Sequence, residues 1–465
     1  MYKILPFYFT RIAGKEILVN EIGDMLILPM GSVKDIVEKK ICESNELYKT
    51  LHANFFISDE ILHPLFEVYV SRLMAKKRNL ESRASLHIFV LTLRCNQNCS
   101  YCQASSRDID SCSVSMSKQT MDKAIDLMFQ SDSDNITMEF QGGEPSLEFD
   151  LIKHGVNRAL SINKKEKKDL SIVLCTNCIS ISDELLAFCK EHSIFISSSL
   201  DGPKELHDKN RGRTGSYEKV IAGFQKVRQY LGNEALSAIM TTSSNSLKYP
   251  TEIVDEYLKQ GFSSIFIRSL NPYGQAIDGT NWDKYTNDFI DFYKKALDYI
   301  LSINERGIFF REEFATIILR KMMTPTDGGF VDLLSPSGIV NSVIVYNYDG
   351  NVYCSDESRM LSEMGDTTFM LGSVDEDYKS LIYGEKVKNI AQVWANECLA
   401  GCSDCAFKTY CGADPVRNYT TQHEMYGNRP HSNWCKKNKA IISYLIELII
   451  KKPKIVLPIF KRWIV

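Results

Sequence analysis

The sequence predicts an α/β fold in which six parallel strands and the helices between them form a partial (β/α)6 barrel. From about residue 87, short apolar segments of strand length alternate with amphipathic segments of helix length, which is the pattern of a parallel sheet with helical crossovers. Six strands are too few to close an eight-stranded barrel. The expected strands are residues 87–93, 136–140, 171–175, 194–198, 236–240 and 264–267.

Three serines predict where helices of the barrel begin. Ser117, Ser182 and Ser216 each precede apolar residues at helical spacing, and a serine hydroxyl at a helix N-cap accepts a hydrogen bond from a free backbone amide. The loops of parallel α/β folds converge at the carboxyl ends of the strands, so we expect the chemistry there.

The barrel is expected to span residues 86–322. The sequence on either side of it predicts three smaller parts. Residues 1–85 predict a small α+β module. Residues 323–440 are rich in Gly, Asp, Ser and Cys around one strand-like run at 343–346, and a loop-rich domain of this kind is a natural place for a metal. Residues 441–465 predict a helical tail docked on the protein or on a partner, with a membrane-surface anchor as the alternative; the run is too short to span a bilayer.

The N-terminal module is expected to contain two strands with an exposed edge. An edge at Ile17–Val19 or Met25–Leu28 would let a leader peptide bind as an added strand, and packing of that edge against the barrel is the alternative. The expected elements are strands at 17–20 and 25–28 joined by a turn at Gly23-Asp24, and helices that begin near Ser32, Asn45 and Ser58.

Composition and charge argue against several classes of function. Lys+Arg 55 against Asp+Glu 58 gives a net charge of -3, and no basic stretch is dense enough to follow a phosphate backbone, so no nucleic-acid partner is expected. The N-terminus lacks the apolar run and cleavage site of an export signal, which predicts a cytoplasmic protein. Half of the 14 cysteines fall into two clusters of a long chain, which favours metal binding over disulfides.

The first cluster places Cys95, Cys99 and Cys102 on a loop just after the first strand. Three thiolates in eight residues can wrap one iron-sulfur cubane and leave its fourth iron open to chelate the amino and carboxylate groups of S-adenosylmethionine (SAM). A zinc knuckle is the alternative, since zinc sites use similar spacings. Motifs at two further strand ends favour the iron-sulfur cluster over zinc.

Those strand ends carry Gln141-Gly142-Gly143-Glu144-Pro145 after the second strand and Ser199-Leu200-Asp201-Gly202-Pro203 after the fourth, followed by His207 and Arg211. The glycines allow a ligand to approach the backbone, and the guanidinium suits a carboxylate. Together, CxxxCxxC, GGEP and SLDGP-x3-H-x3-R resemble the radical SAM superfamily, in the branch that modifies ribosomally made peptides and sulfatases.

This resemblance, which covers residues 87 to about 270, implies a TIM-type radical SAM barrel that binds a [4Fe-4S] cluster and SAM. It implies the following roles: Cys95, Cys99 and Cys102 hold the cluster; Tyr101 lies against the adenine; Gly142, Gly143 and Glu144 contact the methionyl amine; Ser199 and Arg211 contact the carboxylate; Asp201 belongs to the same SAM-binding set; and Gln141 faces the substrate.

The second cluster consists of Cys402, Cys405, Cys411 and Cys435, a closed set of four thiolates for either a [4Fe-4S] cluster or structural zinc. It resembles the SPASM extension of peptide-modifying radical SAM proteins, which favours iron and sulfur. That pattern has a further cysteine where this chain has Pro415, and only Cys354 remains upstream. We therefore expect one auxiliary [4Fe-4S] cluster, suited to electron transfer or to structural stabilisation of the loop-rich domain.

Longer stretches resemble one subfamily, the radical SAM maturase of the His-Xaa-Ser peptide system, across nearly the whole chain. They are residues 18–24, 84–90, 345–350, 401–407 and 410–415. The resemblance implies a precursor peptide with His-Xaa-Ser repeats, a second radical SAM protein of the same system, and an electron donor such as flavodoxin or ferredoxin. The hypothesis is that a 5'-deoxyadenosyl radical abstracts hydrogen from a peptide carbon and the auxiliary cluster takes up an electron.

Two alternatives stay open at this point. One is a sulfatase-type maturase that oxidises Ser or Cys to formylglycine, because the SAM-binding motifs are shared. The other is a non-catalytic iron-sulfur scaffold that keeps the fold without the chemistry.

Overall fold

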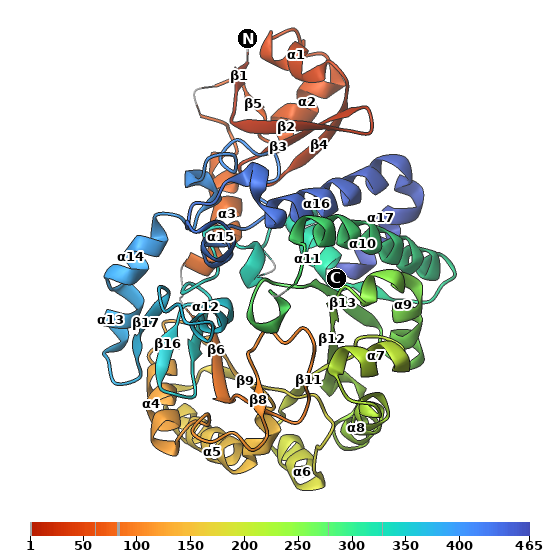
Figure 1. The fold of residues 1–465 in the computed structure, drawn as a ribbon. Helices are drawn as coiled ribbons and strands as arrows, with labels where there is room; N and C mark the ends of the chain where they lie inside the picture. Colours follow the sequence, from red (N-terminus) through yellow and green to blue (C-terminus); the bar gives the residue numbers. More distant parts are fainter. Residues whose placement is uncertain (1, 61, 81–83, 278, 328) are drawn as a thin grey trace.

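The computed structural model describes residues 2–60, 62–80, 84–277, 279–327 and 329–465. Its main element is a ten-stranded sheet that curves through the lower part of Figure 1 and contains all six strands expected from the sequence. The first eight strands of the sheet pair in parallel and the last two join antiparallel. In sheet order they are β14 (Arg311–Glu312), β13 (Ser264–Ser269), β12 (Leu236–Thr242), β11 (Phe195–Ser199), β10 (Asp169–Cys175), β9 (Asn135–Gly142), β6 (Leu86–Thr92), β15 (Val343–Tyr346), β16 (Asn351–Tyr353) and β17 (Met370–Ser373).

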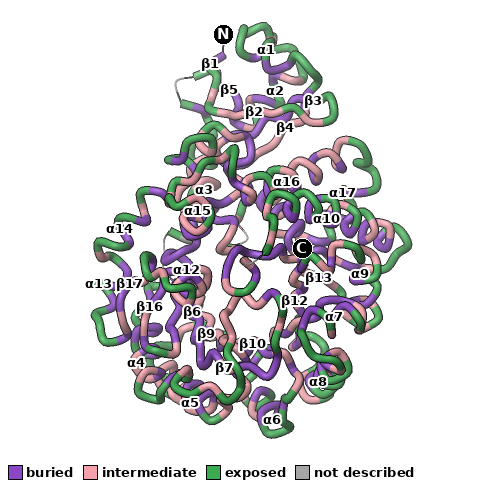
Figure 2. The backbone as a smooth tube through the Cα atoms, viewed as in Figure 1, coloured by how far each residue is buried: buried purple, intermediate pink, exposed green. Residues whose placement is uncertain are grey.

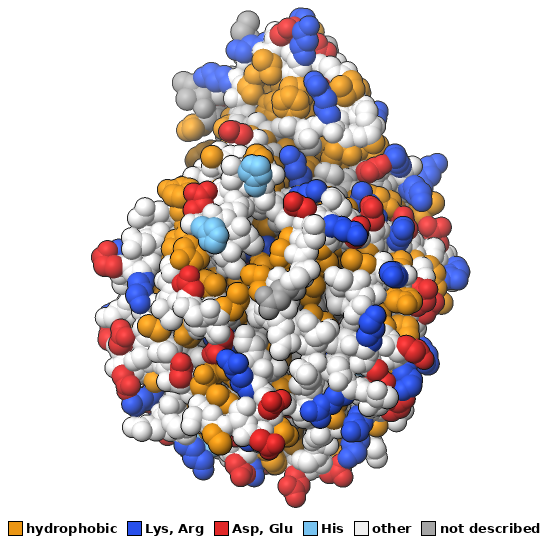
Figure 3. Space-filling view, in the orientation of Figure 1, with side chains coloured by type: hydrophobic (Ala, Val, Ile, Leu, Met, Phe, Trp, Pro, Cys, Tyr) orange, Lys and Arg blue, Asp and Glu red, His pale blue; other side chains and the backbone are white. Residues whose placement is uncertain are grey.

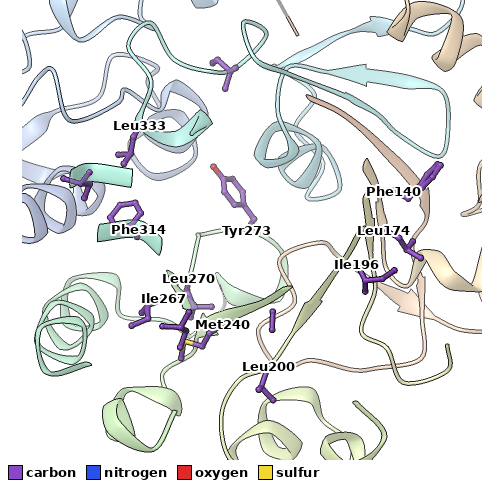
Figure 4. Packing of buried hydrophobic residues seen from close by; sticks show 14 of the residues in the cluster. Phe140, Leu174, Ile196, Leu200, Met240, Ile267, Leu270, Tyr273, Phe314 and Leu333 are labelled. Carbon is purple, nitrogen blue, oxygen red and sulfur yellow. The ribbon is translucent and has the colours of Figure 1, made fainter. Parts of the chain in front are cut away.

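Side-chain alternation along the strands separates a packed outer face from an inner face. Figure 4 shows Phe140, Leu174 and Ile196 of three neighbouring strands close together, and all three are buried in the main apolar cluster. Because successive side chains of a strand point to opposite faces, Glu139 and Gln141 of β9 lie on the inner face. The strands form the buried interior of Figure 2, with the exposed sides of the helices outside them.

The helices follow the strands in the expected alternation, so the predicted α/β fold class is confirmed. They are α4 (Lys118–Met128), α5 (Phe149–Glu166), α6 (Asp183–Glu191), α7 (Lys204–Arg211), α8 (Ser216–Leu231), α9 (Pro250–Lys259), α10 (Trp282–Glu305) and α11 (Glu313–Met323).

Two of the three predicted helix caps are confirmed. The Ser117 hydroxyl accepts from the Thr120 amide and the Ser182 hydroxyl from the Leu185 amide. The helix predicted at Ser216 does begin there, but Ser216 does not cap it, because Gly215 with φ 81° is the N-cap of α8 and Ser216 is its first residue. The Ser216 hydroxyl instead bonds to the Gln97 side chain of the cysteine loop.

The N-terminal module lies at the top of Figure 1. Its strands at 17–20 and 25–28 and its helices at Ser32 and Asn45 are confirmed. The helix expected near Ser58 was wrong: Ser58 pairs with Lys3 in a short two-stranded sheet, and the next helix begins at Phe66. The elements are β1 (Lys3–Ile4), β2 (Phe7–Ile12), β3 (Lys15–Asn20), β4 (Met25–Pro29), β5 (Ile57–Ser58), α1 (Ser32–Val37), α2 (Glu46–Ala53) and α3 (Phe66–Lys76).

The strand order of the module corrects half of the leader-peptide hypothesis. The order is β2-β3-β4, so Ile17–Val19 lies in the central strand and both of its edges are already paired. Within this sheet Met25–Leu28 lies in the edge strand β4. Binding of a leader peptide there stays a prediction.

The C-terminal part joins the barrel through a strand and through two helices, among other contacts. The strand run at 343–346 forms β15, which pairs in parallel with β6 and so extends the barrel sheet. The tail helices α16 (Asn433–Lys451) and α17 (Pro453–Trp463) pack against α10 and α11. The remaining helices are α12 (Asp356–Ser362), α13 (Tyr378–Tyr383), α14 (Glu385–Ala391) and α15 (Pro415–Gln422).

The surface carries charges of both signs. Over the face in Figure 3, Lys and Arg side chains are interspersed with Asp and Glu, as the small net charge of -3 leads one to expect. Within the described part of the chain, no helix has the length and apolar character needed to cross a membrane.

A buried histidine makes the stability of the barrel depend on pH. His87 of β6 lies within hydrogen-bond distance of the Ala84 carbonyl (2.8 Å) and the Tyr346 hydroxyl (3.1 Å), and burial lowers its pKa to about 3. Between the ordinary pKa of 6.5 and that value, the unfolded chain binds a proton that the folded chain does not.

We therefore expect the free energy of unfolding to fall as pH falls below 6.5, with His87 contributing about 1.4 kcal/mol per pH unit. His87→Gln should lower this slope in urea unfolding of the apo protein, whereas the exposed control His431→Gln should not. Equal slopes in wild type and His87→Gln would contradict the assignment.

Candidate active site

The carboxyl ends of β6, β9, β10, β11 and β12 surround a cavity of about 280 Å³. The three cysteines of the first cluster line it, together with residues from each predicted strand end. The lining includes Cys95, Cys99, Tyr101, Cys102, Gln141, Gly142, Gly143, Ser199 and Arg211 from the predicted site. The structure therefore brings together nine of the eleven residues predicted for SAM and substrate, and the other two, Glu144 and Asp201, are buried beside the cavity.

The cysteine loop is held by backbone contact with the end of β9. The Gly143 amide donates to the Thr92 carbonyl at 2.7 Å, and the Glu144 amide donates to the Arg94 carbonyl at 2.7 Å. A Cβ on Gly143 would lie 2.3 Å from the Arg94 oxygen, and one on Gly142 would lie 2.2 Å from the Thr92 oxygen. Only glycine fits at these two positions, so the Gly-Gly pair positions the loop as well as lining the cavity.

A second backbone contact holds the middle of the loop. The Asn98 amide donates to the Arg211 carbonyl at 3.3 Å, and a Cβ on Gly212 would lie 2.1 Å from the Asn98 oxygen. At the end of the loop, the Gln275 amide donates to the Cys102 carbonyl at 2.9 Å. The loop is thus fixed by three separate segments, which orients all three thiols toward one cavity.

The three thiols form a donor set that fits a [4Fe-4S] cluster with one open iron. Burial raises the pKa of Cys95 to about 12 and that of Cys99 to about 11, with the Arg211 guanidinium opposing the shift at Cys99. Thiols in this environment become thiolates only when a cation compensates the cost of burying the charge. Three thiols that line one cavity therefore suit a cluster, with the remaining space left for its ligand.

A buried ion pair fixes the guanidinium at the edge of this cavity. Arg211 donates from Nε and Nη2 to the Asp201 carboxylate at 3.0 and 2.7 Å, and the Tyr101 hydroxyl donates to the same carboxylate at 2.7 Å. Burial raises the pKa of Asp201, but the Arg211 charge outweighs it and leaves the pKa below the ordinary value. Asp201 therefore positions Arg211, whose Nη1 lies 3.9 Å from the Cys99 sulfur.

Glu144 is likewise turned away from the cavity. Its carboxylate accepts from the Thr176 hydroxyl at 2.6 Å and from the Asn177 amide at 2.8 Å, and 1% of the residue is exposed. Thr176 and Asn177 themselves line the cavity. Glu144 thus joins the end of β9 to the end of β10, and its predicted direct contact with the methionyl amine stays a prediction.

Comparison with known proteins agrees with this geometry. Residues 89–263 match the sequence profile of the radical SAM superfamily. These residues form a radical SAM domain. The cysteine-type anaerobic sulfatase-maturating enzyme of Clostridium novyi is 24% identical over 331 residues, which cover 66% of this chain and 84% of the relative. The radical SAM cyclopropyl synthase TigE of Paramaledivibacter caminithermalis is 24% identical over 226 residues, 45% of this chain and 46% of TigE.

Solved structures share the fold of the radical SAM domain and its extensions. Native anSMEcpe with bound AdoMet superposes with a TM-score of 0.64 at 16% identity, covering 80% of this chain and 99% of that one. Streptococcus suis SuiB bound to S-adenosylmethionine has a TM-score of 0.53 at 13% identity, covering 93% and 100%. The cofactor prediction is confirmed at this level: radical SAM domains use a [4Fe-4S] cluster and SAM.

Outside the radical SAM domain, the four predicted auxiliary cysteines lie close enough to act on one another. Burial raises the pKa of Cys411 to about 12, and the nearby charges of Cys402, Cys435 and Cys405 add to the shift. Among the described residues, no group of three or more His, Cys, Asp or Glu side chains is arranged to hold a single metal ion. Four mutually close thiols fit the donor set of a [4Fe-4S] cluster.

The far wall of the radical SAM cavity contains residues that no motif indicated. Asp356 and Glu357 of α12 and Arg268 of β13 line it, and burial together with the charges of Asp332 and Asp356 raises the pKa of Glu357 to about 8. Cys175, at the end of β10, also lines the cavity. Cys175 belongs to neither of the two cysteine clusters of the sequence, and nothing local placed α12 against the barrel.

The ion pair between Asp201 and Arg211 allows a direct test of the SAM-site geometry. Asp201→Asn removes the charge that compensates Arg211, so we expect the unfolding free energy of the apo protein to fall by about 3 to 5 kcal/mol and SAM binding to weaken. Urea unfolding and SAM titration would measure both. The control Asp183→Asn breaks an exposed pair with Lys226 and should have a much smaller effect. Unchanged stability and SAM affinity in Asp201→Asn would contradict the positioning role.

Proposed function

We propose that this chain is a radical SAM enzyme that modifies a ribosomally made peptide, of the His-Xaa-Ser type, by abstracting hydrogen from carbon. The observation that carries the proposal is the single cavity lined by Cys95, Cys99 and Cys102 together with Gln141 and Arg211. Cluster-bound SAM supplies a 5'-deoxyadenosyl radical when an electron arrives. A cytoplasmic location, a second radical SAM protein and a flavodoxin or ferredoxin as electron donor belong to the same proposal.

Each residue that lines the cavity has its own proposed role. Cys95, Cys99 and Cys102 would hold the SAM-binding cluster. Nε and Nη2 of Arg211 are occupied by Asp201, which leaves Nη1 for a carboxylate of SAM. Ser199, at the end of β11, also lines the cavity, and its hydroxyl would donate a hydrogen bond to the same SAM carboxylate. The remaining predicted contacts are Tyr101 with the adenine, Gly142 and Gly143 with the amine, and Gln141 with the substrate.

Cys402, Cys405, Cys411 and Cys435 would hold the auxiliary cluster. Three of them lie on one loop and Cys435 lies in the first turn of α16. The N-terminal module contacts this loop: the Lys408 ammonium pairs with Glu21 at 2.9 Å, and the Tyr410 hydroxyl donates to the Gly23 carbonyl at 2.8 Å. These contacts would couple a leader peptide bound by the module to the auxiliary site.

A peptide substrate is supported by the proteins that share this fold. Native anSMEcpe has been solved with a Kp18Cys peptide, and SuiB with its precursor peptide SuiA. Sulfatase maturation is the second candidate, because the Clostridium novyi relative with that name matches 66% of this chain.

Iron content provides the test of the cofactor assignment. Anaerobically reconstituted wild type should contain about eight irons per chain, and the Cys95/Cys99/Cys102→Ala triple variant about four. A paramagnetic resonance signal that changes with SAM should appear only in wild type, and Cys95→Ala should abolish 5'-deoxyadenosine formation. The exposed cysteine variant Cys42→Ala is the control. Four irons in wild type and none in the triple variant, with zinc in both, would overturn the auxiliary cluster.

The two substrate classes can be separated with synthetic peptides. We expect a peptide with His-Xaa-Ser repeats to stimulate 5'-deoxyadenosine formation at least about tenfold and to change mass. A cysteine peptide of the sulfatase type should not do so. Stimulation by the cysteine peptide alone, with conversion to formylglycine, would replace the His-Xaa-Ser proposal with the sulfatase-maturase one.

A further inference from the structure

Cys175 is the one cysteine outside the two proposed cluster sets that lines the cavity, within the described part of the chain. It is the last residue of β10, and its side chain keeps accessible surface although it lies deep in the barrel. Alternation along β10 buries Ile172 and Leu174 on the outer face, which puts Cys175 on the inner face. The thiol therefore faces the cavity rather than the packed core.

The neighbouring strands place polar side chains around this thiol. Cys175 pairs in register with Ser197 of β11, and the Ser197 and Glu139 side chains lie near enough to affect the thiol. Glu139 of β9 accepts a hydrogen bond from the Gln141 amide at 2.5 Å, so it is a neighbour of both Cys175 and the residue predicted to face the substrate. Four inner-face residues of three adjacent strands thus lie together beside the cavity.

Burial shifts the pKa of both ionisable members of this group upward. Burial raises the pKa of the Cys175 thiol well above its ordinary value, and the nearby Glu139 charge adds to the shift. Burial also raises the pKa of the Glu139 carboxyl, against the hydrogen bond from Gln141. A thiol that stays protonated is a poor nucleophile and a poor metal ligand, but its S–H bond is intact and faces the cavity.

The other cysteines outside the clusters differ in position. Cys178, Cys189 and Cys354 are buried and do not line the cavity, and Cys42, Cys112 and Cys398 are exposed elsewhere on the protein. A role in packing explains the buried three. It does not explain a thiol at the wall of a cavity that also contains the three cluster cysteines.

We propose that Cys175 is a catalytic hydrogen-atom donor, which returns a hydrogen atom to a carbon radical formed in this cavity. The inference rests on the proposed radical function and deepens it. A substrate carbon radical takes hydrogen from the Cys175 S–H, giving a closed C–H bond and a Cys175 thiyl radical. The thiyl radical then takes one electron from a low-potential donor and one proton from the Glu139 carboxyl, which restores the thiol.

This role changes the expected direction of electron flow at the end of the reaction. When hydrogen is returned to the substrate, the oxidation level of the peptide does not change, as in inversion of a stereocentre. The auxiliary site would then pass an electron toward Cys175 instead of taking one from the product. The substrate class is a peptide with an activated C–H bond, and the modification is redox-neutral.

Uncoupled turnover in D2O tests the donor without a known peptide. With SAM, dithionite, no added thiol and no peptide, the nearest carbon radical is the 5' carbon of the deoxyadenosyl group, and the Cys175 S–H exchanges with solvent. We expect wild type to form 5'-deoxyadenosine with one deuterium. Cys175→Ala should lower the singly deuterated fraction at least about fivefold, while the buried-cysteine control Cys189→Ala leaves it unchanged. Mass spectrometry measures the fraction.

The possible outcomes separate this inference from the proposed function. Equal deuterium in wild type and Cys175→Ala, or none in wild type, would overturn the donor role while leaving the radical enzyme intact. No 5'-deoxyadenosine from wild type would overturn the proposed function and the donor role with it. Iron content and SAM affinity should be the same in Cys175→Ala and wild type.

A second readout needs no cofactor. In the apo protein, the infrared difference between wild type and Cys175→Ala isolates the S–H stretch of Cys175. Glu139→Gln should shift that band, because it replaces the carboxyl that the thiol contacts. A band unaffected by Glu139→Gln would exclude Glu139 as the proton source.

Discussion

The backbone contact between the end of β9 and the cysteine loop is the constraint on which the rest of the site depends. The amides of Gly143 and Glu144 donate hydrogen bonds to carbonyls of the residues leading into the loop. A Cβ on Gly142 or on Gly143 would overlap that backbone. A loop whose three thiols line a cavity cannot be held by apolar packing alone, because each thiol must keep one side open. Backbone hydrogen bonds from the end of β9 hold the loop instead. They leave the side chains of the loop available for the chemistry.

Buried charges make this arrangement specific. Asp201 satisfies two guanidinium nitrogens of Arg211 and the Tyr101 hydroxyl, while Glu144 satisfies Thr176 and Asn177. Each carboxylate sits behind the cavity and orients groups that line it. The ion pair of Asp201 with Arg211 costs desolvation energy, so it contributes more to geometry than to net stability. The acidic motif residues of this domain therefore hold the groups that line the cavity.

The parts outside the barrel complete the cavity and connect it to the second cysteine set. Helix α12 closes one wall with Asp356 and Glu357, and β15 ties the C-terminal part into the barrel sheet. The N-terminal module contacts the auxiliary loop through Lys408 and Tyr410.

The sequence by itself determined the elements whose causes are local. The six strands, the caps at Ser117 and Ser182, and the residues gathered at the strand ends follow from side-chain period, capping chemistry and parallel-sheet geometry. Only the tertiary structure decided which strand of the N-terminal module is central, why Ser216 bonds to Gln97 instead of capping α8, and that Cys175 and Glu357 face the same cavity. These outcomes depend on strand order and on contacts between residues far apart in the chain, which no local period encodes.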